Sequence, residues 1–437
     1  MSIPLDRLYY FVEKMAVELQ PDGVVIYRFY PNGSKNVQDL NTVRYASWYS
    51  MATQPHIWCN DQEPLSMEFY EKNENLRNDQ NTWLAILKSL SQYQPPSNLN
   101  YFPNIFQKNL LLHSEKRSQD VEKYLKDGNL IPVYYWSHAI MARDWFRYAQ
   151  HATFKKNVNK QFLIYNRSWG GTREYRLKFS DLLVENGLVD HCQTFCNPIE
   201  NGEHYQTHTF KNPVWRPRHI LENHMPPSVI DADASADFDL EDYQSTEIEV
   251  VLETLFDDGR LHLTEKSLRP IACRQPFILA AAHGSLQYLR DYGFRTFDSV
   301  WDETYDTIED PYPRMQAIIQ LMLEINSRSA DQQRNDAERI QQIADHNHKH
   351  FFSKGFFDLV TGELRTNMNM ALDQIKQDPG FEKWSARWKC LLQFPQVQDF
   401  LDVNQDQSMP MRSQIGKILE YIKTRSQNSC DKHIDIV

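Results

Sequence analysis

The residues that point most directly to chemistry form one short run, Thr264-Glu265-Lys266, which precedes an apolar helical pattern. Threonine is a common N-cap, so we expect Glu265 and Lys266 in the first helical turn, beside backbone N–H groups that lack intrahelical partners. A lysine is unfavourable at this positive end of a helix unless it serves an anion. The run therefore indicates a phosphate site, in which Glu265 accepts hydrogen bonds from sugar hydroxyls. The alternative is an ordinary capped helix with a solvated first turn.

Four other residues are of the types that act as general bases, and each follows an apolar run. A carboxylate or imidazole at such a strand end is able to take a proton from an attacking hydroxyl group. The alternative for each is a loop side chain that caps the next helix. The four are Asp61 and Glu63 after 56–59, Glu115 after 110–113, and His138 after 131–136.

Patterns that suggest metal binding have simpler explanations. Cys192 and Cys196 lack a second cysteine pair at zinc spacing, so we expect two ordinary thiols. Of His346, His348 and His350, only the outer two share a helix face, which favours a solvated helix end. We therefore predict no metal site.

These candidates can form one site only in a fold that brings the ends of several strands together, and the hydrophobic pattern predicts such a fold. Short aliphatic and aromatic runs alternate with helical patterns in both halves of the chain, which is typical of parallel sheets flanked by helices. A polar segment, 155–160, separates the halves. The expected strands are 23–30, 56–59, 110–113, 131–136, 161–166, 247–253 and 276–281, and the expected helices of the second half are 173–185, 265–273, 285–292 and 312–350.

The pattern predicts an α/β protein with two Rossmann-like domains that face each other across a cleft. We expect the first domain at 1–157, the second at 158–400, and a C-terminal helix with a polar tail at 401–437. Segment 223–246 is expected to be a long surface loop. Ligands of such folds bind at the carboxyl ends of strands, where domains or strand order meet.

Composition excludes several classes of protein. The 47 Lys and Arg residues against 58 Asp and Glu give a net charge of −11, which excludes a strongly basic coat for nucleic acid. Six cysteines in 437 residues are too few for a disulfide framework. The amino-terminal run does not resemble a signal peptide, and no stretch approaches the apolar length of a membrane span. We therefore expect a soluble, cytoplasmic protein without membrane association.

The run at 264–266 is part of a larger ordered pattern that resembles a known family. It lies between Phe162-Leu163-Ile164-Tyr165-Asn166-Arg167 and the elements Gln275-Pro276-Phe277-Ile278, Gly284-Ser285-Leu286 and Leu289-Arg290-Asp291-Tyr292-Gly293-Phe294. Across residues 160–325 this set resembles the donor-binding half of GT-B glycosyltransferases, in particular fucosyltransferase-type, exostosin-type and phage-encoded enzymes. The phage enzymes also carry elements similar to Asp61-Gln62-Glu63-Pro64 and His113-Ser114-Glu115-Lys116.

The resemblance implies roles for individual residues. In the fucosyltransferase-like families the Glu of this run contacts the nucleotide ribose and the Lys contacts the diphosphate, so these roles fall on Glu265 and Lys266. Arginines neutralise the diphosphate, which implies that no metal or other cofactor is obligatory and that the nucleotide-diphosphate sugar is the co-substrate. The other residues expected to bind the donor are Arg167, Arg173, Arg176, Arg260, Gly284 and Ser285.

The implied activity is transfer of a sugar to a hydroxyl acceptor. We expect inversion at the anomeric carbon, whereas a retaining enzyme would stabilise an internal-return path. The phage likeness suggests hydroxymethylated pyrimidines of phage DNA as acceptor, in the host cytoplasm. Basic clusters at 155–160 and at Arg216 with Arg218 favour DNA, and the net charge of −11 opposes it. A cell-envelope glycan is the alternative acceptor, and a non-catalytic sugar-nucleotide-binding protein is the alternative function.

Overall fold

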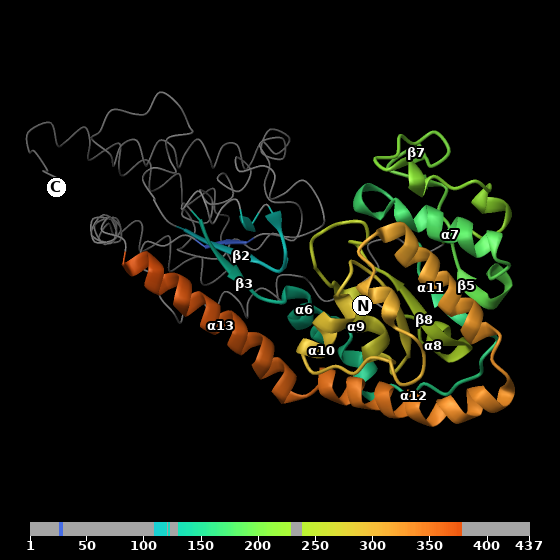
Figure 1. Ribbon diagram of the computed structural model, residues 1–437. Helices are drawn as coiled ribbons and strands as arrows, with labels where there is room; N and C mark the ends of the chain where they lie inside the picture. Colours follow the sequence, from blue (N-terminus) through green and yellow to red (C-terminus); the bar gives the residue numbers. More distant parts are fainter. Residues whose placement is uncertain (1–25, 29–108, 120, 123–129, 229–237, 378–437) are drawn as a thin grey trace, which may run out of the picture.

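The computed structural model describes residues 26–28, 109–119, 121–122, 130–228 and 238–377 (Figure 1). The expected strand 56–59 and the expected C-terminal segment 401–437 lie outside the described residues. The described part is a mixed α/β structure with parallel sheets and surrounding helices.

The first sheet has the parallel order that the alternating pattern predicts. It contains β1 (Ile26–Arg28), β2 (Asn109–His113) and β3 (Leu130–Tyr134), paired in the order β1-β2-β3. The chain then forms α6 (Ser137–Trp145) and η2 (Arg147–His151). The carboxyl ends of β2 and β3 are adjacent, because His113 pairs with Tyr134.

The second sheet is also parallel and contains a change of strand order. Its strands are β4 (Lys160–Ile164), β5 (Cys192–Thr194), β8 (Thr246–Leu252) and β9 (Phe277–Ala280), arranged β5-β4-β8-β9. From β4 the chain moves to one side to form β5 and later returns to the other side to form β8. This reversal creates a topological switch point at the carboxyl ends of β4 and β8, the place where open α/β sheets bind ligands. The sheet is compatible with a Rossmann-like fold.

Helices connect and cover these strands, and most of them agree with the sequence prediction. α7 (Tyr175–Glu185) links β4 to β5, and α9 (Glu265–Ala272) links β8 to β9. All four residues of β9 are buried, as expected for a strand covered on both faces. The remaining elements are η3 (Gly171–Arg173), η4 (Val189–His191), β6 (Ile199–Glu200), β7 (Glu203–His204), η5 (Pro213–Trp215), η6 (Leu221–Asn223), α8 (Leu240–Ser245), α10 (Ser285–Asp291), η8 (Thr304–Thr307), α11 (Pro311–Asn326), α12 (Ala330–Phe351) and α13 (Lys354–Lys376).

The predicted helical stretch 312–350 consists of two helices. Ser329 separates them, because its side chain and that of Gln332 form a capping box at the start of α12. α12 packs on α9, and α13 continues from it to contact β2, β3 and α6. The two helices therefore run along both sheets (Figure 1).

Two segments that we expected to be irregular are tied to the second sheet. The polar segment 155–160 donates backbone hydrogen bonds to α8, from Asn157 N to Gln244 O at 2.8 Å and from Asn159 N to Ser245 O at 2.9 Å. The predicted loop 223–246 contains α8, whose N-cap Asp239 accepts from Glu241 N. The loop prediction was wrong for α8, because capping and packing on β4 and β8 stabilise a short helix there.

An aromatic cluster joins the two sheets. Trp136, just after β3, is fully buried, and its ring contacts Tyr288 at 4.9 Å and Tyr292 at 4.8 Å between centroids. Its indole N–H donates to Leu263 O at 2.9 Å, in the loop before α9. The cluster fixes the carboxyl end of the first sheet against the loop that leads into α9.

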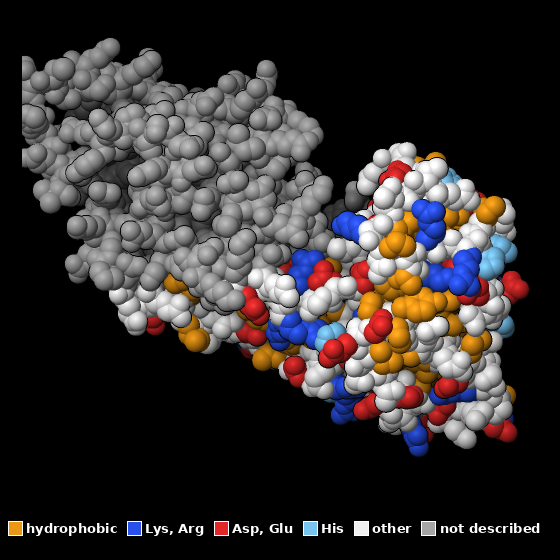
Figure 2. All heavy atoms as spheres, turned by 45° about the horizontal axis from the view of Figure 1, so that its top comes forward, with side chains coloured by type: hydrophobic (Ala, Val, Ile, Leu, Met, Phe, Trp, Pro, Cys, Tyr) orange, Lys and Arg blue, Asp and Glu red, His pale blue; other side chains and the backbone are white. Residues whose placement is uncertain are grey.

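Charges of both signs are interspersed among the described residues on the face that Figure 2 displays, and they form no continuous basic stripe on that face. No helix within the described ranges is long and apolar enough to cross a membrane.

Candidate functional site

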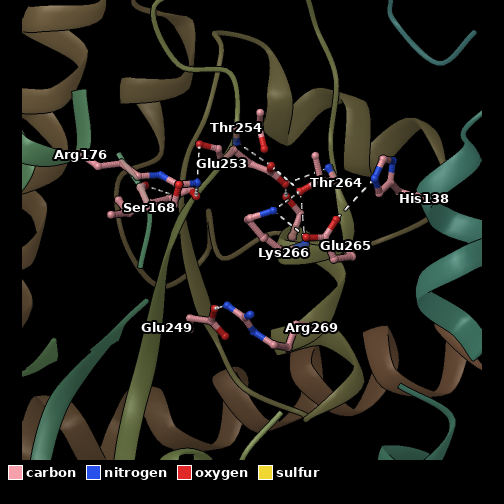
Figure 3. A network of polar contacts seen from close by, with 12 residues as sticks. His138, Ser168, Arg176, Glu249, Glu253, Thr254, Thr264, Glu265, Lys266 and Arg269 are labelled. Carbon is pink, nitrogen blue, oxygen red and sulfur yellow. Dashed lines mark hydrogen bonds and ion pairs between the residues drawn. The ribbon is translucent and has the colours of Figure 1, made fainter. Parts of the chain in front are cut away.

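The centre of the candidate site is the amino end of α9, which has the cap that the sequence predicts. Thr264 is extended, with φ −99° and ψ −174°, and its side chain accepts from Lys266 N at 3.4 Å. Glu265 and Lys266 therefore occupy the first turn, after the carboxyl end of β8 and at the switch point of the sheet (Figure 3).

A carboxylate that sequence reasoning missed holds this turn in place. Glu253 follows β8 directly and is fully buried. Its carboxylate accepts from Thr264 N at 2.9 Å, from the Thr264 hydroxyl at 2.7 Å, and from Thr254 N at 3.0 Å. The Ser267 hydroxyl donates to it as well. The sequence does mark Glu253 as a candidate, since it is a charged residue at the end of an apolar strand, where ligand-binding and capping residues are expected.

Glu265 lies between a lysine of its own turn and His138 at the start of α6, the helix that follows β3 (Figure 3). Its two carboxylate oxygens are 2.5 Å from Lys266 Nζ and 3.4 Å from His138 Nε2. Burial alone would raise the pKa of this carboxyl group, but the charges of Lys266 and His138 lower the pKa to about 2. Glu265 is therefore ionised at neutral pH, and its contact with His138 joins two candidates that are 127 residues apart in sequence.

The loop before α9 is attached to the strand ends of the first sheet. Lys116 and Leu261 form an antiparallel bridge, with N···O distances of 2.9 and 2.8 Å. Arg260 Nη1 lies 2.9 Å from Glu115 Oε1, and Arg260 Nη2 lies 2.5 Å from Asp258 Oδ2. The Glu115 side chain is fully buried, so its carboxylate offsets the charge of Arg260 across the two sheets.

A second histidine, His262, completes the polar contact between the sheets. His262 Nδ1 lies 3.0 Å from Ser114 O, and its ring centroid lies 5.0 Å from that of His138. Burial lowers the pKa of His262 to about 4, so it is neutral at pH 7. Its Nε2 is buried and has no hydrogen-bond partner among the residues that the structure describes. We had not singled out His262, because an isolated histidine in a loop carries no sequence signal.

The three arginines after β4 have different environments. Arg176 is buried and donates to Ser168 O at 2.8 Å and to Leu252 O at 2.6 Å, so it ties the carboxyl end of β8 to the loop after β4 (Figure 3). Arg173 is half-exposed and lies 3.4 Å from the Glu200 carboxylate. Arg167 stacks over the Tyr165 ring at 4.4 Å. Their contact with a diphosphate stays a prediction; Arg167 and Arg173 are partly exposed, whereas Arg176 is buried.

The amino end of α10 already has an anionic partner. Gly284 adopts φ +80°, a left-handed conformation that favours glycine, and Gly284 N donates to Asp306 O at 2.8 Å. The Asp306 carboxylate accepts from Leu286 N at 3.1 Å, and the Ser285 hydroxyl donates to Ala282 O at 2.5 Å. Ligand binding by Gly284 and Ser285 remains a prediction, and Asp306 occupies the position that a phosphate would take.

The remaining candidates either have contacts that stabilise the fold or lie outside the described residues. Asp61 and Glu63 belong to the latter group. Cys192 and Cys196 are free, buried thiols, and burial raises the pKa of each to about 12. The prediction of a solvated helix end was wrong for His348, which is buried and contacts Ala272 O. His346 and His350 are half-exposed, and their rings contact the backbone carbonyl oxygens of Gly293 and Tyr292, respectively.

One group in the described part has metal-ligand geometry. Asp181, Glu185 and His219 bring ligand atoms within 4.8 Å of one another. The ammonium of Lys178 already contacts both carboxylates, at 3.4 Å in the case of Glu185. A lysine in that position supplies the positive charge that a cation would bring.

The assembled site has the components for binding a phosphate-containing ligand. It combines a helix amino end, one partly exposed lysine, a nearby arginine and a buried ionised carboxylate next to a histidine. No protein-family model, curated protein or solved structure matches the chain.

Proposed function

We propose that the chain is a GT-B-like glycosyltransferase that takes a sugar from a nucleotide diphosphate. One observation carries the proposal: the α9 turn with Glu265 and Lys266 lies at the switch point of one parallel sheet and contacts the start of α6, the helix that follows the last strand of the other. A ligand at this turn is therefore within reach of groups from both sheets. That is the geometry needed to bring a donor and an acceptor together.

The diphosphate would be bound by the positive end of α9. Backbone N–H groups of the first turn, the Lys266 ammonium and the Arg173 guanidinium supply positive charge without a metal ion. Lys266 now pairs with Glu265 at 2.5 Å, so a diphosphate would share the ammonium with this carboxylate. The remaining lone pairs of Glu265 would accept hydrogen bonds from the ribose hydroxyls.

His138 is the best-placed general base in the described part of the chain. The acceptor oxygen would bond to the anomeric carbon, the bond from that carbon to the diphosphate would break, and His138 would take the hydroxyl proton. Glu265, 3.4 Å away, would stabilise the imidazolium. Glu115 is less suitable, because its Oε1 offsets the charge of Arg260. General bases of this kind contribute roughly 10²–10⁴-fold in rate.

The acceptor proposal is a hydroxymethylated pyrimidine of DNA, with a cell-envelope glycan as the alternative. Some of the basic residues that favoured DNA already have partners within the protein. Lys156 donates to Tyr243 O and Thr246 O, both at 2.8 Å, and Lys160 donates to Asp190 O at 2.6 Å. Arg218 lies 3.6 Å from Glu185. The proposal for DNA therefore rests on the sequence resemblance, not on these cations.

Calorimetry with a panel of nucleotide sugars tests donor binding. Lys266→Ala should weaken the donor that the wild-type protein binds by about tenfold or more, because a charge-assisted hydrogen bond is lost. Lys349→Ala, at an exposed position of α12, is the matched control and should bind normally. Equal affinity of the wild-type and Lys266→Ala proteins would refute the site, and no binding of any nucleotide sugar by the wild-type protein would refute the function.

Mass measurement of the products tests catalysis and the acceptor. The protein is incubated with hydroxymethylcytosine DNA or with lipopolysaccharide, together with the donor found by calorimetry. A sugar mass on the nucleoside supports the DNA acceptor, and transfer only to lipopolysaccharide supports the envelope alternative. Donor binding without transfer or hydrolysis would identify a non-catalytic binding protein. We expect His138→Ala to lose the transfer activity and keep donor affinity, and chelator to change neither.

A further inference from the structure

A pocket of about 390 Å³ lies away from the candidate site, between the loop after α10 and α12. Three arginines contribute to its lining: Arg290 in the last turn of α10, Arg295 in the loop, and Arg339 on α12. α10 begins at the carboxyl end of the second sheet, where Gly284 is its N-cap, so the last turn of α10 lies at the other end of the helix, away from Gly284. The volume is within the range of small-molecule pockets, which starts at about 300 Å³.

The charge of this arginine pocket is positive in a chain of net charge −11. Glu303 neutralises Arg290, at 2.6 Å, and Asp298 is the only carboxylate in the lining. Arg295 and Arg339 are exposed and form no ion pair within the described ranges; Arg339 only reaches Ser299 O, at 3.4 Å. Three guanidinium groups thus face two carboxylates, which leaves an excess of positive charge for an anion.

Arg290 is fixed in a way that leaves one edge of its guanidinium open. Its Nε and Nη2 donate to Thr296 Oγ1 at 2.9 and 2.6 Å, and Nη2 also contacts Glu303. Its Nη1 makes no hydrogen bond to any residue that the structure describes. An arginine held on one side and open on the other is preorganised for an anion, because little side-chain entropy is lost on binding.

The loop that carries Arg295 is fixed as well. The buried Asn347 of α12 accepts from Arg295 N and donates to Arg295 O, both at 2.8 Å. Farther along the loop, Arg328 donates to Val300 O at 2.9 Å. The pocket wall is thus attached to α12 and to the segment just before it, and does not need to fold around a ligand.

We propose that the arginine pocket binds a small phosphorylated molecule through its phosphate monoester group. The paired N–H groups of a guanidinium match the geometry of two phosphate oxygens. A phosphate dianion would both neutralise the excess positive charge of the pocket and accept a hydrogen bond from the open Nη1 of Arg290. Gln342 in the lining offers a polar contact to the rest of the molecule. The proposal is independent of the nucleotide-sugar function of the α9 site.

Calorimetry with three probes tests the proposal: inorganic phosphate, a sugar monophosphate and a nucleoside 5′-monophosphate. The double variant Arg295→Gln with Arg339→Gln should weaken the best probe by at least about tenfold, since two charged contacts are lost. Arg334→Gln is the matched control, because this exposed arginine is on the same helix and pairs with Asp331 outside the pocket. It should bind like the wild-type protein.

Hydrogen exchange of the wild-type protein gives a second measurement that needs no variant. The best probe should protect amides of the loop 293–300 and leave the first turn of α9 unchanged. Tighter binding of a monophosphate ester than of inorganic phosphate identifies an organic ligand, and equal affinities identify a site for phosphate itself. The proposal is wrong if no probe binds at millimolar concentration. It is also wrong if the double variant binds the best probe with the same affinity as the control Arg334→Gln.

Discussion

Replacing Glu253 with glutamine is the sharpest test of how the α9 turn is held. The carboxylate accepts hydrogen bonds from Thr254 N, Thr264 N, the Thr264 hydroxyl and the Ser267 hydroxyl. A glutamine oxygen is able to replace one carboxylate oxygen, but its amide NH₂ must then face a donor such as Thr254 N. That buried N–H loses its partner, which costs roughly 1–3 kcal/mol, and the remaining bonds lose their charge assistance.

Together these losses predict that Glu253→Gln lowers the free energy of unfolding by about 3 kcal/mol. Urea denaturation followed by tryptophan fluorescence measures the global change. Hydrogen exchange of α9 amides measures the local one, and a local opening free energy lower by that amount accelerates exchange about a hundredfold. Donor affinity should fall as well, because Lys266 is in the same turn.

Glu247→Gln is the control for this experiment. Glu247 is on β8, the strand that precedes Glu253. It is half-exposed and accepts from the side chain of Gln161, so its loss should change stability by less than about 0.5 kcal/mol. An effect of Glu253→Gln as small as that of the control would refute the view that this carboxylate organises the site.

Three further predictions follow from buried side chains. Burial lowers the pKa values of His113 and His262 to about 4. As pH falls below 6.5, the unfolded chain therefore binds protons at these histidines before the folded chain does. The free energy of unfolding should decline between about pH 6.5 and 4, by about 3 kcal/mol for each histidine. Urea unfolding at several pH values should show a shallower decline for His262→Gln. Trp136→Ala should lower the unfolding free energy by about 3–5 kcal/mol, measured by urea denaturation, because its ring fills the core between the sheets. Cys192 and Cys196 should resist iodoacetamide at pH 7.5 in peptide mapping of the native protein, since burial raises both thiol pKa values to about 12, and rapid native labelling would contradict their burial.

Local features of this protein were predictable because they depend on neighbouring residues. The Thr264 cap and the end of α7 are examples: Asn186 is the C-cap and Gly187 follows with φ +66°, as the Asn-Gly pair indicates. The apolar runs in the described ranges predicted parallel strands in both halves, since buried strands need continuous apolar residues. The start of α8 was missed because the acidic residues that cap it look like an ordinary polar loop.

The partners of the polar residues were decided only by tertiary structure. The contact of Glu265 with His138 joins residues 127 positions apart, and that of Arg260 with Glu115 spans 145 positions. Nothing in the sequence near Arg176 indicates that its guanidinium bonds to backbone carbonyls at the end of β8. The amino-acid sequence by itself determines which residues can be charged, capped or buried, because these properties are local. The pairing of the charged residues is set by the packing of the two sheets and the helices between them. That packing depends on long-range contacts, which cannot be predicted from the spacing of neighbouring residues.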